Sequence, residues 1–114
     1  MSENGMPKTA EDFYDRAFEY FGEDDDKAIA DSTQAIRLDP NHDSAYSLRG
    51  QIYFTKGDFD RAIADHNEAI RINPDFAGYY CQRGRAYKAK GDRDRALKDF
   101  NKAEEITPGV TTGY

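Results

Sequence analysis

Residues 43–76 and 77–110 are two copies of one pattern, repeated at a spacing of 34 residues. A repeat of this length indicates one supersecondary unit that is stacked on copies of itself. Each unit contacts only its neighbours, so we expect a binding surface along the stack in place of a catalytic pocket. The copies carry the same residue at fifteen positions, which in the first copy are Tyr46, Arg49, Gly50, Tyr53, Lys56, Gly57, Asp58, Asp60, Arg61, Ala62, Asp65, Asn67, Ala69, Ile72 and Pro74.

Each copy is predicted to form two helices joined by a short turn. In the middle copy Asp43 or Ser44 can cap a first helix that extends to about Lys56, before a glycine and an aspartate break it. Apolar residues at three- and four-residue steps then predict a second helix from about residue 59 to residue 72. An Asn-Pro pair ends that helix, and the last copy repeats the plan.

A third, less regular copy precedes these two. Residues 24–40 match residues 58–74 at ten positions, whereas residues 9–23 match almost nothing. Thr9 with an acid three residues later resembles a capping box. The helix that would follow carries apolar residues on one face, namely Phe13, Ala17, Tyr20 and Phe21.

These segments predict an all-α fold, a solenoid of three tandem helix-turn-helix repeats. We expect one domain over residues 9–110, with repeats over about 9–42, 43–76 and 77–110. Residues 1–8 would form a flexible leader and residues 111–114 a tail. The first repeat is expected to diverge, because a terminal unit has solvent on one side instead of a neighbour.

The composition fits a folded protein with a heavily solvated exterior. Charged residues make up 33% of the chain and the mean hydropathy is -0.95, but 13% of the residues are aromatic and they recur periodically. Cys81 is the single cysteine, so no internal disulfide can form. The chain has neither an apolar run long enough for a membrane span nor a secretory signal, so a cytoplasmic location is expected.

Charge is distributed unevenly along the chain. The net charge is -6, which disfavours long contacts with nucleic-acid phosphates. Residues 1–42 carry eleven acids and four bases, residues 43–76 six and four, and residues 77–110 five and eight. Such runs are consistent either with solvated faces that have no specific partner or with ends that attract each other.

The repeat resembles the tetratricopeptide repeat (TPR), whose pattern places large residues, glycine, alanine and proline at fixed positions. In the middle copy those places hold Tyr46, Arg49, Gly50, Tyr53, Ala62, His66, Ala69 and Pro74, and in the last copy Tyr80, Arg83, Gly84, Tyr87, Ala96, Phe100, Ala103 and Pro108. The resemblance implies a right-handed superhelix and a non-enzymatic module that binds a peptide or partner segment in a concave groove.

The residues of that groove follow from the face that turns away from the partner helix. The middle copy would contribute Ser44, Ser47, Gln51, Phe54 and Thr55, and the last copy would contribute Cys81, Arg85 and Lys88 together with Gly78 and Ala89. In the first copy Phe13 and Tyr20 would line the groove, with Ala17 and Phe21 beside them. The predicted groove is therefore apolar at one end, polar in the middle and cationic at the other, and it would suit a partner segment with apolar and acidic parts.

Some family members clamp the C-terminal carboxylate of heat-shock chaperones with lysine, asparagine and arginine. The matching places here hold Phe13, Ala17, Leu48, Gly78 and Gln82, none of which is a clamp residue. The resemblance therefore disfavours chaperone tails as ligands.

The sequence lacks the motifs of an enzyme, a metal site or a cofactor site. It contains no phosphate-binding glycine loop, no HExxH and no paired cysteines with metal spacing. His42 is expected in a loop, and His66 replaces an aromatic residue on a packing face, which favours a structural role. Neither a catalytic residue nor a metal or cofactor is predicted.

Self-assembly is the alternative function. The chain stops shortly after the last repeat, so Ala86, Leu97 and Ile106 are expected to stay partly exposed there. A basic end that meets the acidic end of another molecule would give a head-to-tail scaffold. The predicted partner is therefore a protein or peptide ligand, with a homo-oligomer as the alternative.

Overall fold

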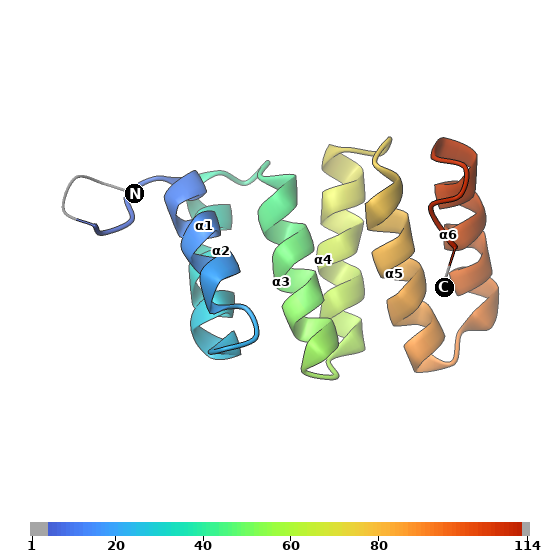
Figure 1. Cartoon of the computed structure of the whole chain (residues 1–114), viewed down its shortest axis with the longest axis horizontal. Helices are drawn as coiled ribbons and strands as arrows, with labels where there is room; N and C mark the ends of the chain where they lie inside the picture. The colour runs from blue at the N-terminus through green and yellow to red at the C-terminus, as the bar shows by residue number, and fades with distance from the viewer. Residues whose placement is uncertain (1–4, 113–114) are drawn as a thin grey trace.

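The computed structural model describes residues 5–112. Antiparallel helices pair as α1/α2, α3/α4 and α5/α6, and the pairs stand side by side along the long axis (Figure 1). No strand occurs in this part of the chain, which confirms the predicted all-α class. Residues 1–4 of the predicted leader and 113–114 of the predicted tail lie outside the described residues. The six helices are α1 (Ala10–Tyr20), α2 (Asp25–Leu38), α3 (Asp43–Thr55), α4 (Phe59–Ile72), α5 (Ala77–Lys90) and α6 (Arg93–Ile106).

Side-chain caps fix the starts of most helices. Thr9 forms the expected capping box with Asp12 at the start of α1. The second helix of every pair begins after an aspartate whose carboxylate accepts a backbone N–H three residues on, and these caps are Asp24, Asp58 and Asp92. A cap of this kind satisfies one of the backbone donors that a helix start leaves without an intrahelical acceptor.

The cap of α3 differs from the prediction. His42 takes this place, and its Nδ1 accepts the N–H of Ala45 at 3.0 Å. Asp43 lies inside the helix, where its carboxylate accepts the Tyr79 hydroxyl at 2.8 Å. His42 Nε2 also lies 2.9 Å from a carboxylate oxygen of Glu11 in α1, so the residue expected in a loop links two helix pairs.

Glycine sets the close approach of the helices in the second and third pairs. A Cβ on Gly50 would lie 2.6 Å from Cε1 of His66, and one on Gly84 would lie 2.7 Å from Cε1 of Phe100. The rings of α4 and α6 thus rest on the bare backbone of α3 and α5. In the first pair Ala17 takes the glycine place and is fully buried.

An arginine also joins the two helices of each pair. Arg49 donates from Nε and Nη2 to the two carboxylate oxygens of Asp65, at 2.8 and 2.7 Å. Arg83 makes the same two hydrogen bonds to Asp99, at 2.9 and 2.6 Å. Two parallel bonds to one carboxylate fix the rotation of one helix against the other as well as the distance between them.

The first pair repeats this contact in a different register. Arg16 donates to both carboxylate oxygens of Asp31 at 2.8 Å, but it precedes that aspartate by 15 residues where the other pairs have 16. Helix α1 ends two residues early, because Gly22 turns with a positive φ of 91° at a place where α3 is still helical. The connecting loop is one residue longer, so the residues of α1 align with those of α3 at a spacing of 33.

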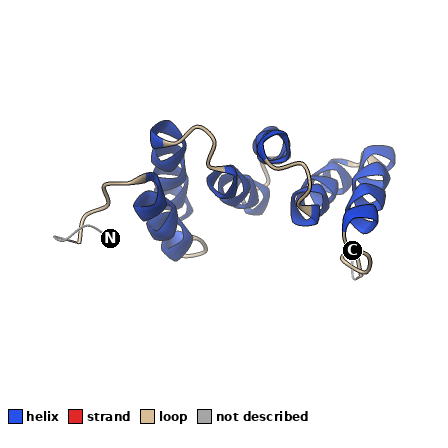
Figure 2. Cartoon of the chain, turned by 90° about the horizontal axis from the view of Figure 1, so that it is seen from above, coloured by secondary structure: helices blue, strands red, loops and turns tan. Residues whose placement is uncertain are grey.

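Apolar clusters join neighbouring pairs into one solenoid. One cluster packs Ala17 and Ala28 of the first pair against Leu48 and Ile52 of α3. Another packs Ala62 and Ile63 of the second pair against Ala86 of α5. Figure 2 shows the chain from above, where successive pairs follow one another as a bent row of helices.

Candidate functional site: a groove along the first helices

A groove runs across the first helices of the three pairs. Its larger hollow, about 470 Å³, is lined by Phe21, Gln51, Phe54, Thr55, Gly57, Phe59, His66, Gln82 and Arg85. Its smaller hollow, about 250 Å³, is lined by Tyr14, Phe18, Ser44, Ser47, Leu48, Gln51, Phe76, Tyr79 and Gln82. Because Gln51 and Gln82 belong to both hollows, we treat them as one surface and call it the groove.

The residues predicted from the middle repeat lie in this groove. Ser44, Ser47, Gln51 and Phe54 all line it. Ser47 is only 4% exposed, and its hydroxyl donates to Gln82 Oε1 at 2.7 Å. Gln51 Nε2 donates to the Ser47 hydroxyl at 3.3 Å. These hydrogen bonds hold two amide side chains in place at the centre of the groove.

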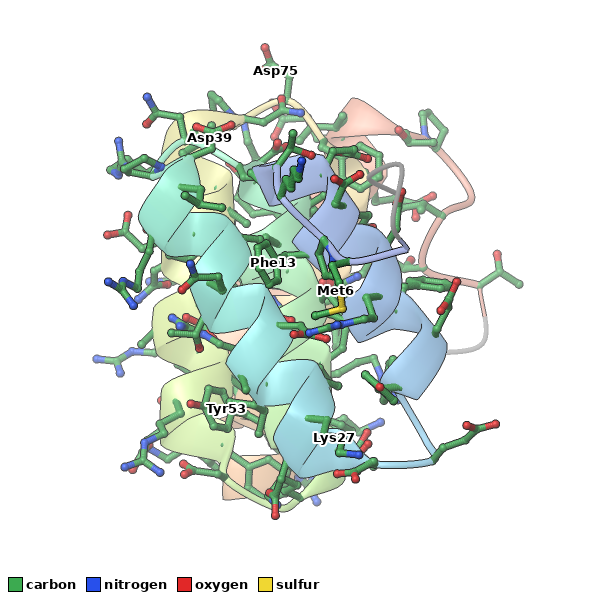
Figure 3. The ribbon with its side chains drawn as sticks, turned by 90° about the vertical axis from the view of Figure 1, so that its left-hand side faces the viewer. Met6, Phe13, Lys27, Asp39, Tyr53 and Asp75 are labelled. Carbon is green, nitrogen blue, oxygen red and sulfur yellow. The ribbon has the colours of Figure 1, made fainter. Side chains whose placement is uncertain are left out.

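Phe13 and Tyr20 do not line it, and this corrects the register expected for α1. Phe13 lies between α1 and α2 (Figure 3), with the Arg16 guanidinium 5.7 Å from its ring centre. Arg49 lies over Tyr46 in the same way at 5.9 Å. Tyr20 packs into the apolar cluster at the first junction. Both residues therefore have packing positions inside the stack.

Tyr14 and Phe18 contribute the groove surface of α1 instead, and Phe21, which was expected in this region, lines the groove just after the helix ends. Phe18 is 62% exposed, which is high for so large an apolar side chain. The ring of Tyr14 lies 5.0 Å from the ring of His42 and 6.5 Å from that of Phe18, centre to centre. The signal that could have found them is Arg16, which fixes the alignment with α3 once it is matched to Arg49.

The third pair places its predicted residues in three different environments. Arg85 lines the groove, and its guanidinium carbon lies 4.9 Å from the centre of the Phe54 ring. Cys81 is 2% exposed and packs with Ala77, Tyr80 and Ala103, and burial raises the pKa of its thiol. Lys88 lines a separate hollow beside α6. Of these three predicted residues, Arg85 therefore supplies the positive charge of the groove.

His66 forms part of the floor of the groove. It is 1% exposed, and its buried Nδ1 has no hydrogen-bond partner among residues 5–112. Burial, together with the smaller effect of the Arg83 and Arg85 charges, lowers the pKa of this imidazole to about 4. The ring is thus neutral near pH 7 and fills the place that Phe100 has in the third pair.

Residues 5–112 contain no group of three or more histidine, cysteine or acidic side chains arranged to hold a metal ion. Across the same residues, each helix is too short or too polar to cross a bilayer.

Family models match most of the repeat region. A model described as TPR repeat matches residues 50–91, and two described as tetratricopeptide repeat match residues 33–64 and 77–110. The chain belongs to the tetratricopeptide repeat family. No curated protein sequence gave a significant match.

Several solved structures are similar to this chain. The crystal structure of MamA is 35% identical with a TM-score of 0.83, and the match covers 86% of this chain and 58% of that one. The first TPR of Spaghetti (RPAP3), bound to the HSP90 peptide SRMEEVD, is 27% identical with a TM-score of 0.87, covering 90% and 82%. YrrB, described as a TPR protein with an unusual peptide-binding site, is 23% identical with a TM-score of 0.84 and shares the fold. The chain spans a little over half the length of MamA and of YrrB, at 58% and 54%.

Proposed function

We propose that this chain is a non-enzymatic interaction module that binds an extended segment of a partner protein in the groove. The observation that carries the proposal is the union of two hollows through Gln51 and Gln82 into one surface. The family consists of interaction modules in general, and the Spaghetti domain holds a peptide. Proteins with this fold have many functions, so the fold alone does not select a partner. The side chains that line the groove do so.

The lining suggests the chemistry of the segment. Tyr14, Phe18 and Phe21 offer aromatic surface at one end, and Phe54 continues it toward α5. Arg85 adds a positive charge beside Phe54. We therefore expect a segment with two or more large apolar side chains, followed by an acidic residue or a C-terminal carboxylate near Arg85.

Peptide selection tests this proposal. A random peptide library displayed on phage is selected on the wild-type chain, and binding of the enriched peptides is measured by calorimetry. The double variant Phe54→Ala, Arg85→Glu should weaken binding by about a hundredfold, because a buried aromatic contact and a charge pair are lost together. The matched control is Leu38→Ala, Arg37→Glu, which alters an exposed leucine and arginine of α2 outside the groove. Equal losses in both variants, or no enrichment, would refute groove binding.

Chaperone tails remain disfavoured after the register correction. The two places of α1 that the clamp would use move by one residue, from Phe13 and Ala17 to Tyr14 and Phe18. Neither is a lysine or an asparagine. We expect the peptide SRMEEVD to bind more weakly than about 1 mM, and micromolar binding, about -8 kcal/mol, would contradict this.

Self-assembly through the ends is the second candidate. It is favoured by Leu97, which is 59% exposed on α6. The opposite end argues against it, because α1 presents Asp15 and Glu19 at the places where α5 has Gln82 and Ala86. A head-to-tail contact in the geometry of the stack would thus set Glu19 against Leu97. Light scattering that shows growth with concentration and dissociation in high salt would favour self-assembly over the groove.

A further inference from the structure

Each junction between helix pairs repeats the same three contacts. At the first junction Asp26 pairs with Lys56 at 2.8 Å, and Thr33 accepts from Arg49 at 3.1 Å. Between these polar contacts Ile29 packs in the cluster that contains Ile52. The second helix of a pair thus offers an acid, an aliphatic side chain and a hydrogen-bond acceptor at spacings of three and four residues.

The second junction uses the equivalent residues. Asp60 pairs with Lys90, and Asn67 Oδ1 accepts from Arg83 Nη1 at 3.0 Å. Ile63 lies between them in the cluster that contains Ala86. The incoming first helix therefore presents arginine, an apolar residue and lysine at i, i+3 and i+7, and it runs antiparallel to the helix that receives it.

Helix α6 carries the receiving pattern once more. Asp94, Leu97 and Asn101 follow Asp60, Ile63 and Asn67 at a spacing of 34 residues. Leu97 is 59% exposed, whereas Ile63 is 9% exposed beneath α5. Among residues 5–112, neither Asp94 nor Asn101 has the ion pair or hydrogen bond that its counterpart makes.

The described C-terminal residues, 107–112, pack against the C-terminal half of α6. Val110 packs with the cluster around Cys81 and Ala103, and Glu104 holds the segment by accepting from Gly109 and Thr111. Within residues 5–112, the C-terminal segment leaves the N-terminal half of α6 uncovered, and Leu97 there is exposed. A hollow of about 440 Å³ borders this half, lined by Lys88, Arg93, Ala96, Leu97 and Phe100, and Leu97 is the residue that it shares with the receiving pattern.

We propose that the N-terminal half of α6 binds a basic amphipathic helix of another protein, which carries arginine, a small or branched apolar residue and lysine at i, i+3 and i+7. Lysine would pair with Asp94, the apolar side chain would cover Leu97, and arginine would donate to Asn101. A second copy of this chain does not fit, because its two helices with this pattern, α3 and α5, are already packed inside the stack. Its exposed helix α1 presents acids instead. The surface is separate from the groove, so both could be occupied together.

The probe is a synthetic peptide with the sequence of residues 77–90, in which serine replaces Cys81. We expect it to shift the backbone amide signals of Asp94, Leu97 and Asn101 in an NMR titration of the labelled chain. Leu97→Ser should weaken binding by about tenfold, because a buried aliphatic contact is lost. Leu38→Ser is the matched control, since Leu38 is 49% exposed on α2 and has no place in this surface.

A charge exchange makes the test specific. Asp94→Lys should lower the affinity of the chain for the peptide. A second peptide, with glutamate in the place of Lys90, should restore the affinity for that variant alone. The proposal is overturned if shifts appear only at Gln51 and Gln82 in the groove, or if no shift appears at millimolar peptide. It is also overturned if sedimentation shows a dimer of the chain that Leu97→Ser abolishes, because the occupant would then be a second copy.

Discussion

The second and third helix pairs share one framework and differ in the surfaces that they expose. Both rest a ring on a glycine, and both clamp an aspartate with an arginine at almost the same distances. The ring, however, is His66 in one pair and Phe100 in the other. Phe54, which lines the groove in the second pair, has Lys88 as its counterpart in the third pair. Positions that repeat therefore fix the backbone, whereas positions that vary decide what the surface can bind.

The largest effect should come from the shared framework. Asp65→Ala and Asp99→Ala each leave a partly buried guanidinium without its carboxylate, and each should lower the free energy of unfolding by about 3 to 4 kcal/mol. We take the low end of the range for buried pairs, because Arg49 and Arg83 keep 19% and 22% of their side chains exposed. Urea denaturation measures both, with the exposed Asp75→Ala as control. Losses that differ by more than about 1 kcal/mol would mean that the pairs are not equivalent.

The second effect should appear in one pair only. Between the ordinary pKa of 6.5 and the folded value of about 4, the unfolded chain protonates His66 and the folded chain does not. Stability due to this residue is therefore complete above pH 6.5 and is lost as the pH falls toward 4, by about 2 to 3 kcal/mol. His66→Phe should remove this part of the pH dependence. The measurement compares urea midpoints of the two proteins across the interval, and parallel curves would contradict the assignment.

A smaller loss of stability is expected for glycine-to-alanine variants, and its size should depend on whether the ring that faces the glycine can move. Gly50→Ala and Gly84→Ala push a methyl group against rings that are enclosed between helices, and each should cost about 1 to 2 kcal/mol. Gly78 offers a matched control in α5, because its added Cβ meets the edge of Phe76, a side chain that is 49% exposed and can move. Gly78→Ala should be neutral or gain up to about 1 kcal/mol from helix propensity. Thermal melts in which all three variants lose stability equally would rule out the packing argument.

The smallest effect is expected for the ion pairs on the outer edge of the junctions. Lys56→Ala and Lys90→Ala each remove a pair between side chains that remain largely in solvent. Exposed pairs gain little, because solvent screens them and ordering two long side chains costs entropy. Neither variant should move the urea midpoint beyond experimental error, and added salt should leave the wild-type midpoint unchanged. A clear loss in one variant alone would show that the two junctions differ.

Much of the groove could be predicted, and the exceptions share a cause. Ser44, Ser47, Gln51, Phe54 and Arg85 lie where the helical period places them, because the second and third pairs keep a strict spacing. The groove residues of α1 were predicted one position away from their true places. The helix is two residues shorter at its end and the following loop is one residue longer, so the change in spacing is only one residue. Local pattern cannot detect such a compensation, whereas the contact between Arg16 and Asp31 reveals it.

The sequence by itself determined the repeat, the helix pairs and the glycines at their closest approach, because all three are set by residues a fixed number of positions apart. Only the tertiary structure decided that Phe18 faces the groove, that Cys81 is buried and that His42 caps α3. It also decided that Leu97 is exposed although its counterpart Ile63 is covered. Those outcomes depend on which neighbour a residue contacts in the stack. A residue in the last repeat has the same sequence pattern as its counterpart in the middle repeat, but no following repeat packs on it within the described residues.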